Sequence, residues 1–374
     1  MTDFLFATWD GGGNVPPAVV LASELQRRGH TVRFLGHETQ RDALTGAGFA
    51  FASYDGVRAF SGVEASSVPR LLAMFSDRRL GRALLTELER RPADVVVVDC
   101  LLVPVLRACA VAGQTYVSLE HLLDAYLRGG WLHGPVGLVD RIKRLDPVTA
   151  WEQAALCLVM APPSLDPASA RRLPANVRHV GPLVELPPPH DLTSHEPAVL
   201  VSLSTFHYAG MTPALQRILD ATAGIDARVV VTTGPVIDPA VLRTAANHEV
   251  HRFVPHDELM SRVSLVVGHG GHATTMRALA HDLPLALMPM HPLLDQPLVA
   301  RAVAARGAGE VLRKRASPER IRRSVVRLLA EGPHREAAAR LGAEIRELDG
   351  TRTAADLVER LTDIPGRRTG RTVA

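Results

Sequence analysis

The chain has 374 residues, of which 47% are hydrophobic and 22% are charged, and its formal net charge at neutral pH is only +3. A single hydrophobic core rarely serves a chain of this length, so we expect two domains. The small net charge and the lack of a long basic run disfavour a nucleic-acid-binding protein.

No membrane span and no secretory signal are predicted. The longest apolar stretch, residues 95–113, is interrupted by Asp99, Pro104 and Arg107. The first residues lack a basic region followed by an apolar run. The three cysteines lie in apolar surroundings, as small core side chains do, rather than in a disulfide pattern. These features predict a cytoplasmic protein.

Short apolar strands alternate with amphipathic helices along the chain, which is typical of parallel α/β sheets. Strands are expected at residues 4–8, 31–35, 93–98, 198–203, 228–232, 250–253, 264–267 and 285–288, and helices at 17–28, 213–222 and 354–361. Residues 115–150 are less regular and are expected to be loops that shape a pocket. Residues 181–197 are proline-rich without periodicity, as an interdomain linker would be.

The most informative segment runs from Phe253 to Gly309. A buried strand leads into the turn Gly268-His269-Gly270-Gly271 and then into a helix that opens near Ala273-Thr274-Thr275. Backbone N–H groups at such a helix start cradle a phosphate. A second strand and a proline-containing loop follow, ending in Asp295-Gln296. A carboxylate and an amide downstream of an anion site predict a sugar nucleotide as the ligand.

This segment resembles the donor-binding signature of GT-B nucleotide-sugar glycosyltransferases, the group that includes UDP-glucuronosyltransferases and bacterial antibiotic glycosyltransferases. The signature reads roughly PH-x-x-L, V-x-H-G-G-x-G-T, G-x-P, D-Q and G-x-G. The chain supplies these elements in order: Pro255-His256, Leu259, Val267, His269-Gly270-Gly271, Thr274, Pro284, Asp295-Gln296 and Gly307-Ala308-Gly309. It departs at Ala273 and Asp282, where the family has glycine. Alanine at a helix start costs little if its φ is negative.

The resemblance implies an α/β protein of the GT-B fold, with two Rossmann-like domains facing across a cleft. It divides the chain into an acceptor-binding domain (1–180), a linker (181–197), a donor-binding domain (198–350), a helix returning to the first domain (351–364) and a tail (365–374). It further implies a monomeric or homodimeric, inverting glycosyltransferase of natural-product biosynthesis. The substrates would be a dTDP- or UDP-sugar and a small-molecule acceptor, a secondary metabolite, with no cofactor and no metal.

The resemblance also assigns the donor site. The departing diphosphate would be stabilised by the helix start and by His269. Asp295 and Gln296 would bind sugar hydroxyls, and the nucleobase would lie along residues 252–254. The full set of donor-binding candidates is His269, Gly270, Gly271, Ala273, Thr274, Asp295, Gln296, Ser204, Thr205 and Val254.

Each donor element also has a purely structural interpretation. The glycines at 270 and 271 are compatible with a plain strand-to-helix turn, and Ser204-Thr205 with a helix cap or a turn. The histidines at 269, 272, 281 and 291 do not have the spacing of zinc ligands, and no cysteine pair accompanies them. No metal site is therefore predicted.

The first domain lacks the usual catalytic base of the family. In related enzymes the loop after the first strand reads G-H-x-x-P, and its histidine deprotonates the acceptor. Aligning Pro17 with that proline places Asn14 where the histidine belongs. An amide does not accept a proton near neutral pH. The family often pairs the histidine with an aspartate at the end of a later strand, and Asp99 occupies that location.

Four explanations for the missing base remain open. In the first, which we favour, Asp99 acts as the base while Asn14 positions the acceptor. In the second, Asp10 acts as the base and reaches in from the same loop as Asn14. Alternatively, His121 takes the proton, or an acidic acceptor needs little help. A strand-end carboxylate at position 99 is equally compatible with a helix cap. A lone histidine such as His121 is more often an ordinary loop residue.

Two other functions fit the sequence. A nucleotide-sugar epimerase shares the fold but needs acid and base groups around the donor sugar. A non-catalytic homologue that binds a nucleotide or assists a partner glycosyltransferase would tolerate the loss of the base. A dehydrogenase is disfavoured, because Pro16-Pro17 follow Gly11-Gly12-Gly13 where close helix packing needs glycine. The intact donor signature favours glycosyl transfer.

Overall fold

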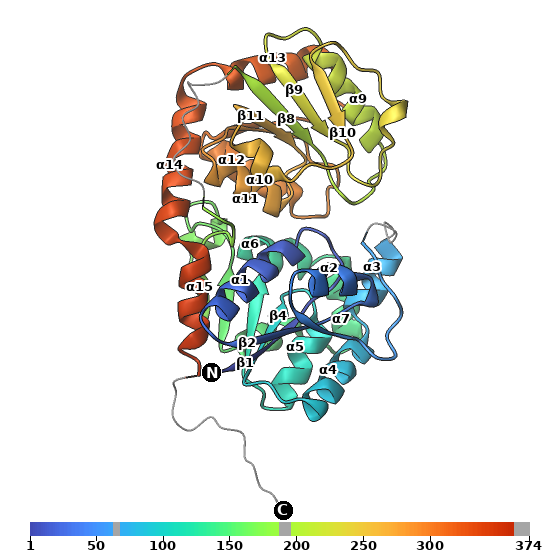
Figure 1. The fold of residues 1–374 in the computed structure, drawn as a ribbon, viewed down its shortest axis with the longest axis vertical. Coiled ribbons are helices and arrows are strands. Elements are labelled where there is room, and N and C mark those ends of the chain that lie inside the picture. The colour runs from blue at the N-terminus through green and yellow to red at the C-terminus, as the bar shows by residue number, and fades with distance from the viewer. Residues whose placement is uncertain (63–67, 187–195, 363–374) are drawn as a thin grey trace, which may run out of the picture. The chain divides into compact units, whose positions relative to one another are not determined.

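The computed structural model describes residues 1–62, 68–186 and 196–362. The chain forms two compact α/β units (Figure 1). The first unit contains Met1–Ala161, Ala168–Val184 and the chain from Asp349 onward, and the second contains Pro162–Pro167 and Glu185–Leu348. Most of the predicted linker and the whole predicted tail, 365–374, lie outside the described residues.

The first unit is built on a parallel sheet of seven described strands in the order β3-β2-β1-β4-β5-β6-β7. Its strands are β1 (Asp3–Ala7), β2 (Thr31–Gly36), β3 (Ala50–Ser53), β4 (Val95–Asp99), β5 (Tyr116–Glu120), β6 (Leu156–Val159) and β7 (Val177–His179). Every residue of β4 and β5 is buried, as expected for central parallel strands covered on both faces. The sheet order reverses between β1 and β4, where ligands bind in open α/β sheets.

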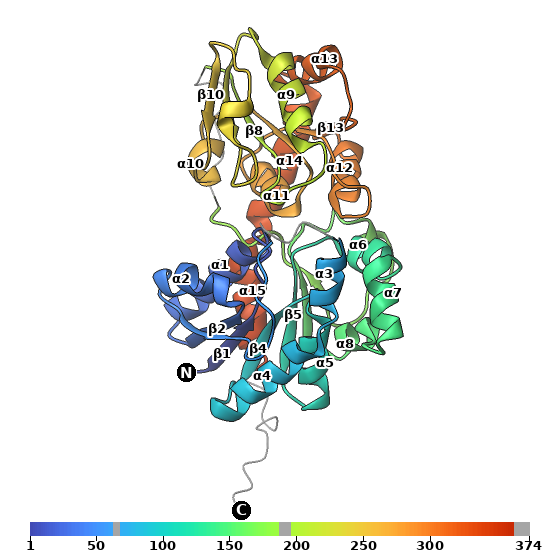
Figure 2. The same cartoon turned by 90° about the vertical axis from the view of Figure 1, so that its right-hand side faces the viewer.

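Helices cover the sheet of the first unit on both faces (Figure 2). They are α1 (Val15–Arg27), α2 (Arg41–Gly46), α3 (Val68–Phe75), α4 (Arg78–Arg90), α5 (Val103–Val111), α6 (Asp124–Tyr126), α7 (Pro135–Ile142), α8 (Pro147–Glu152) and α15 (Gly350–Glu359). Shorter helical turns are η1 (Glu38–Gln40), η2 (Leu127–Trp131) and η3 (Pro167–Ala170).

The expectation of irregular loops over residues 115–150 was wrong. This region contains β5, α6, η2 and α7 and the start of α8. Pro135 and Pro147 are the first residues of α7 and α8. Proline is well suited to the first helical position, since its missing N–H has no partner there and its φ is helical.

The last described helix belongs to the first unit. In α15, Ala354, Ala355 and Val358 are buried in the same core as α1 and β1. The Arg28 guanidinium, at the end of α1, lies 2.6 Å from carboxylate oxygens of both Asp356 and Glu359. An apolar face and two ion pairs therefore hold α15 against α1.

The second unit repeats the architecture with a parallel sheet of six described strands in the order β10-β9-β8-β11-β12-β13. Its strands are β8 (Ala198–Ser202), β9 (Arg228–Thr232), β10 (His248–His251), β11 (Leu265–Gly268), β12 (Leu285–Leu287) and β13 (Gly309–Val311). Its helices are α9 (Met211–Thr222), η4 (Pro239–Val241), α10 (His256–Met260), α11 (His272–Ala280), α12 (Gln296–Ala305), α13 (Pro318–Leu329) and α14 (Pro333–Leu348). The strand order reverses between β8 and β11, and in open α/β sheets ligands bind at the strand ends beside such a reversal.

Two departures from the sequence signature have a backbone explanation. Asp282, which replaces a glycine of the family, has a φ of 59°, and aspartate is among the few non-glycine residues that adopt such a left-handed conformation. Ala273 lies within α11 and has no positive φ, so alanine is tolerated there. No helix in the described ranges is both long and apolar enough to cross a membrane.

Candidate functional site

The loops at the carboxyl ends of β1, β4 and β5 bring three predicted residues together. These strands are neighbours in the sheet, with Ala7 paired to Val98 and Asp99 paired to Leu119. Parallel neighbours end at the same edge. Asn14, Asp99 and His121 therefore converge there from distant parts of the sequence.

Asp99 is the centre of this cluster. Its Oδ2 accepts a hydrogen bond from Nδ2 of Asn14 at 2.8 Å and lies 3.3 Å from Nδ1 of His121. Its Oδ1 accepts a hydrogen bond from the backbone N–H of Leu101 at 3.0 Å. The side chains of Asp99 and His121 are 6% and 12% exposed. We call Asn14, Asp99 and His121 the Asp99 cluster.

The structure does not bring Asp10 into the Asp99 cluster. The Asp10 carboxylate accepts a hydrogen bond from the Thr39 hydroxyl at 2.8 Å. It also lies near His37, whose pKa is lowered to about 4 by burial while the Asp10 charge acts in the opposite direction. Asp10 thus links the loops after β1 and β2, and among the described residues no hydrogen bond joins its side chain to Asn14, Asp99 or His121.

Sequence reasoning missed that Cys100 adjoins the cluster. Its Sγ lies 3.9 Å from Nδ1 of His121, and Asp99, Cys100 and His121 offer three potential metal ligands within 4.8 Å of one another. Burial, with the charges of Asp99 and Glu120, raises the pKa of the Cys100 thiol well above its usual value. Both Asp99 oxygens already accept hydrogen bonds, one from the Asn14 amide and one from the Leu101 backbone N–H. Both observations favour a hydrogen-bonded cluster over a preformed metal site.

The predicted glycine turn and helix start lie between β11 and α11 in the second unit. Gly270 has a φ of 82°, and a Cβ there would lie 2.9 Å from the Gln296 carbonyl oxygen. A Cβ on Gly271 would lie 2.5 Å from Nε2 of His269. Position 270 therefore requires glycine, and a Cβ at position 271 would displace the His269 ring. Gly271 caps α11 without a side-chain hydrogen bond, which leaves the first N–H groups of the helix, including those of Ala273 and Thr274, available to an anion.

His269 is uncharged at neutral pH. Burial lowers its pKa to about 4, and the nearby His256 acts in the same direction. Among the described residues, none hydrogen-bonds the buried Nδ1 of His269. His269 therefore offers a ligand a neutral imidazole rather than a positive charge. The Nε2 of His256 lies 3.1 Å from the Ser202 hydroxyl at the end of β8.

Asp295 and Gln296 lie at the start of α12 in different chemical states. The Gln296 Oε1 accepts hydrogen bonds from the backbone N–H groups of Met290 and His291 at 2.8 and 3.1 Å. Its NH₂ group is the remaining donor, and it lies beside the Tyr208 hydroxyl. Burial raises the pKa of Asp295 to about 7, although backbone N–H groups oppose the increase. Sequence reasoning missed Tyr208, whose hydroxyl lies beside Ser204, Asp295 and Gln296.

The other donor candidates lie at the same edge of the sheet. The Ser204 hydroxyl accepts a hydrogen bond from the backbone N–H of Phe206 at 3.0 Å, so it forms the predicted turn. Thr205 is exposed and Val254 half-buried. Residues 252–254 directly follow β10, and Phe253 between them is 79% exposed.

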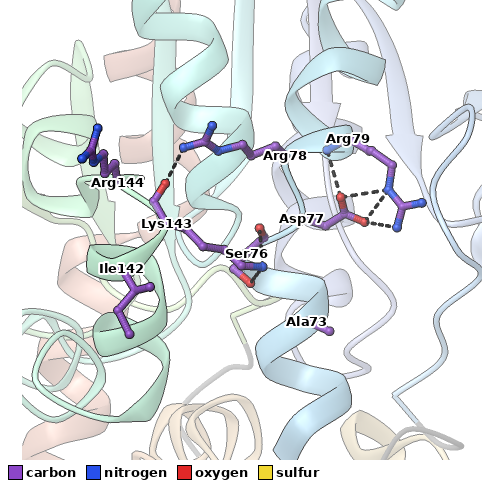
Figure 3. A pocket seen from close by; sticks show the side chains of 8 residues that line it. All are labelled: Ala73, Ser76, Asp77, Arg78, Arg79, Ile142, Lys143 and Arg144. Atoms are coloured by element: carbon purple, nitrogen blue, oxygen red, sulfur yellow. Dashed lines mark hydrogen bonds and ion pairs between the residues drawn. The ribbon is translucent and has the colours of Figure 1, made fainter.

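An open pocket of about 640 Å³ in the first unit contains none of the predicted site residues (Figure 3). It lies where the ends of α3 and α7 meet the start of α4. The Lys143 ammonium donates to the Ser76 hydroxyl at 2.8 Å, and Arg79 pairs with Asp77 at 2.8 Å. Arg78 donates to the Lys143 carbonyl. All three cations therefore already have partners among the residues that line the pocket. The contacts between Lys143 and Ser76 and between Arg78 and Lys143 join the end of α7 to the turn before α4.

The two parallel α/β sheets are those of the GT-B fold, and comparisons with known proteins identify the class of enzyme. Residues 216–362 match the family described as Erythromycin biosynthesis protein CIII-like, C-terminal domain. The 4'-demethylrebeccamycin synthase of Lentzea aerocolonigenes is 30% identical, over 96% of this chain and 99% of its own. The uncharacterized UDP-glucosyltransferase YojK of Bacillus subtilis strain 168 is 22% identical, over 96% and 97%.

The fold is similar to that of CalG4, the calicheamicin glycosyltransferase. The two structures agree with a TM-score of 0.79 and 25% sequence identity, over 98% of this chain and 99% of that one. The chain belongs to the GT-B glycosyltransferases related to those of natural-product biosynthesis. The predictions of fold class, family and enzyme class are thus confirmed.

Proposed function

We propose that the protein transfers a sugar from a dTDP- or UDP-sugar to a small-molecule acceptor, a secondary metabolite, with inversion at the anomeric carbon and without a metal ion. The observation that carries this proposal is the open start of α11 behind Gly270 and Gly271, where a Cβ would meet the Gln296 backbone or the His269 ring. The similarity to 4'-demethylrebeccamycin synthase supports an acceptor of that general class.

The cradle suits the charge that develops as the nucleoside diphosphate leaves. The N–H groups at the start of α11 and the positive end of the helix dipole stabilise phosphate oxygens. His269, uncharged at neutral pH, adds a hydrogen bond to the same anion. This set consists of N–H donors, whereas a magnesium site would use carboxylates. The donor chemistry therefore supports metal-independent transfer.

The start of α12 supplies recognition of the sugar. The NH₂ group of Gln296 donates to a hydroxyl oxygen, because its carbonyl oxygen is already bonded to the loop at 290–291. Asp295 accepts hydrogen bonds from sugar hydroxyls through its carboxylate. Tyr208 adds a hydroxyl beside both residues. These groups bind the sugar while the attacked anomeric carbon stays free of covalent contact with the protein, as a single inverting displacement requires.

The Asp99 cluster supplies the acceptor side of the reaction. Asn14 offers no basic atom, so the acceptor proton passes to the carboxylate or the imidazole of the cluster. The three residues lie at the reversal point of the first sheet, as the cradle does in the second.

Thermal stability in the presence of dTDP, UDP, GDP, ADP or NAD tests the donor site. A nucleotide at a hundredfold excess over its dissociation constant stabilises the folded state by about 2.7 kcal/mol. We expect stabilisation by dTDP or UDP in the wild type and in Gly46→Ala, where a Cβ meets no atom within 4 Å. Gly271→Ala should lose it. Stabilisation by NAD alone, or an unchanged response in Gly271→Ala, would refute the proposal.

Turnover separates the proposed transfer from the two alternatives. Incubation of dTDP- or UDP-glucose with phenolic and alcoholic acceptors should yield glycosides, whose anomeric configuration NMR would report as inverted. Recovery of an altered donor sugar would identify an epimerase. Nucleotide binding that is never followed by transfer would identify an auxiliary protein.

A further inference from the structure

We propose that His121, oriented by Asp99, is the catalytic base that takes the proton from the acceptor. This inference rests on the proposed sugar transfer and deepens it by assigning the base. The catalytic imidazole would lie on the loop after β5, whereas related enzymes carry it on the loop after β1. Asp99 would be a positioning residue rather than the base itself.

The contacts of Asp99 leave it poorly placed to take a proton from a ligand. Its Oδ1 accepts from the Leu101 backbone, and its Oδ2 accepts from Asn14 and lies 3.3 Å from His121. The residue is only 6% exposed. Both oxygens thus already have donors, and little of the carboxylate surface is accessible to an acceptor molecule.

His121 has the complementary arrangement. Its Nδ1 faces the carboxylate, which favours the tautomer with the proton on Nδ1 and the lone pair on Nε2. No described residue hydrogen-bonds Nε2. The ring also lines a cavity of about 10 Å³ with Asn14, Asp99 and Thr8, which has room for roughly one water molecule.

Asn14 strengthens this division of roles. Its Nδ2 donates to Asp99 at 2.8 Å and to the Trp9 carbonyl at 3.1 Å. The amide therefore fixes the carboxylate, whose Oδ2 the imidazole also approaches. Cys100, 3.9 Å from Nδ1 of His121, does not compete for the ring as an anion, because burial keeps its thiol protonated.

The chemical step balances without a further reactant. The acceptor oxygen forms a bond to the anomeric carbon while the bond from that carbon to the diphosphate oxygen breaks. Nε2 of His121 takes the acceptor proton, and the resulting imidazolium is stabilised by the Asp99 carboxylate. The bonding electrons leave with the nucleoside diphosphate, and the imidazolium later releases its proton to water.

Acceptor acidity distinguishes a base from a residue that only supports the fold. Transfer from dTDP-glucose or UDP-glucose would be measured with 4-nitrobenzyl alcohol and with the far more acidic 4-nitrophenol. His121→Asn should lower transfer to the alcohol by roughly a hundredfold to ten-thousandfold and transfer to the phenol by less than tenfold. Asp99→Asn should show the same selectivity. The exposed His133→Asn serves as the matched control and should resemble the wild type.

Equal losses with both acceptors, or no loss in His121→Asn, would overturn the assignment. The ¹⁵N NMR spectrum of His121 in the wild type provides a test that needs no acceptor. The dyad requires the proton of the neutral ring on Nδ1, and a ring protonated on Nε2 contradicts it even if neither acceptor is turned over. Nucleotide-induced stabilisation should be unchanged in all three variants. If nucleotides failed to stabilise the wild type, the donor site would be refuted. The ring tautomer would then decide the role of His121.

Discussion

Replacing Asp295 with asparagine should stabilise the protein at alkaline pH. Burial raises the pKa of Asp295 to about 7, whereas an aspartate in an unfolded chain titrates near 4. Between these values the unfolded chain has released the proton and the folded protein still holds it. The free energy of unfolding therefore falls as the pH rises from about 4 to 7, and the cost is complete above pH 7.

The size of the effect follows from the difference in pKa. A difference of roughly three units corresponds to about 4 kcal/mol as an upper limit. The Asp295 side chain is only half-buried, so water reduces the cost, and we expect Asp295→Asn to gain about 1–2 kcal/mol at pH 8. The amide keeps an oxygen that can accept from the backbone N–H groups of residues 295 and 296.

Urea unfolding of the wild type and Asp295→Asn at pH 4 and pH 8 would measure this effect. The gain should be present at pH 8 and nearly absent at pH 4. Asp226→Asn, which removes the same charge from an exposed turn, is the control and should change stability little at either pH. Equal stabilisation at both pH values, or destabilisation at pH 8, would show that the ionised carboxylate carries no burial cost. Sugar transfer should fall in Asp295→Asn, since active sites commonly sacrifice stability for function.

Three further outcomes are expected. Asn14→His should fold normally by circular dichroism. In the His121→Asn background it should partly restore transfer to 4-nitrobenzyl alcohol, since it returns an imidazole to Asp99. No recovery of transfer would count against position 14 as a base site. Leu158→Ala, at a fully buried position of β6, should lower the free energy of urea unfolding by about 2–5 kcal/mol, and a loss below 1 kcal/mol would contradict its core role. Arg28→Ala should lower the free energy of unfolding by about 1–2 kcal/mol. The Arg27 side chain is 72% exposed, so Arg27→Ala should lower it by less than about 0.5 kcal/mol. Equal losses in the two variants would show that the ion pairs to α15 contribute nothing to stability.

The sequence alone predicted the donor cradle, because that element is local. A strand, a glycine turn and a helix start are contiguous between Leu265 and Ala280, and the φ of Gly270 depends mainly on its neighbours. The alternation of strands and helices likewise predicted two parallel α/β units. The seven- and six-stranded sheets confirm this, since periodicity and strand length are properties of short segments.

The tertiary structure was needed for every contact between distant segments. Asn14 and Asp99 are 85 residues apart, and their meeting depends on β4 lying beside β1. Strand order is set by packing of the whole sheet, which no local pattern encodes. The same reason explains why Tyr208 was missed and why the sequence left Asp10, Asp99 and His121 open as candidate bases. Local backbone preferences determined the glycine turn before α11, and the long-range order of the strands determined which side chains meet at Asp99.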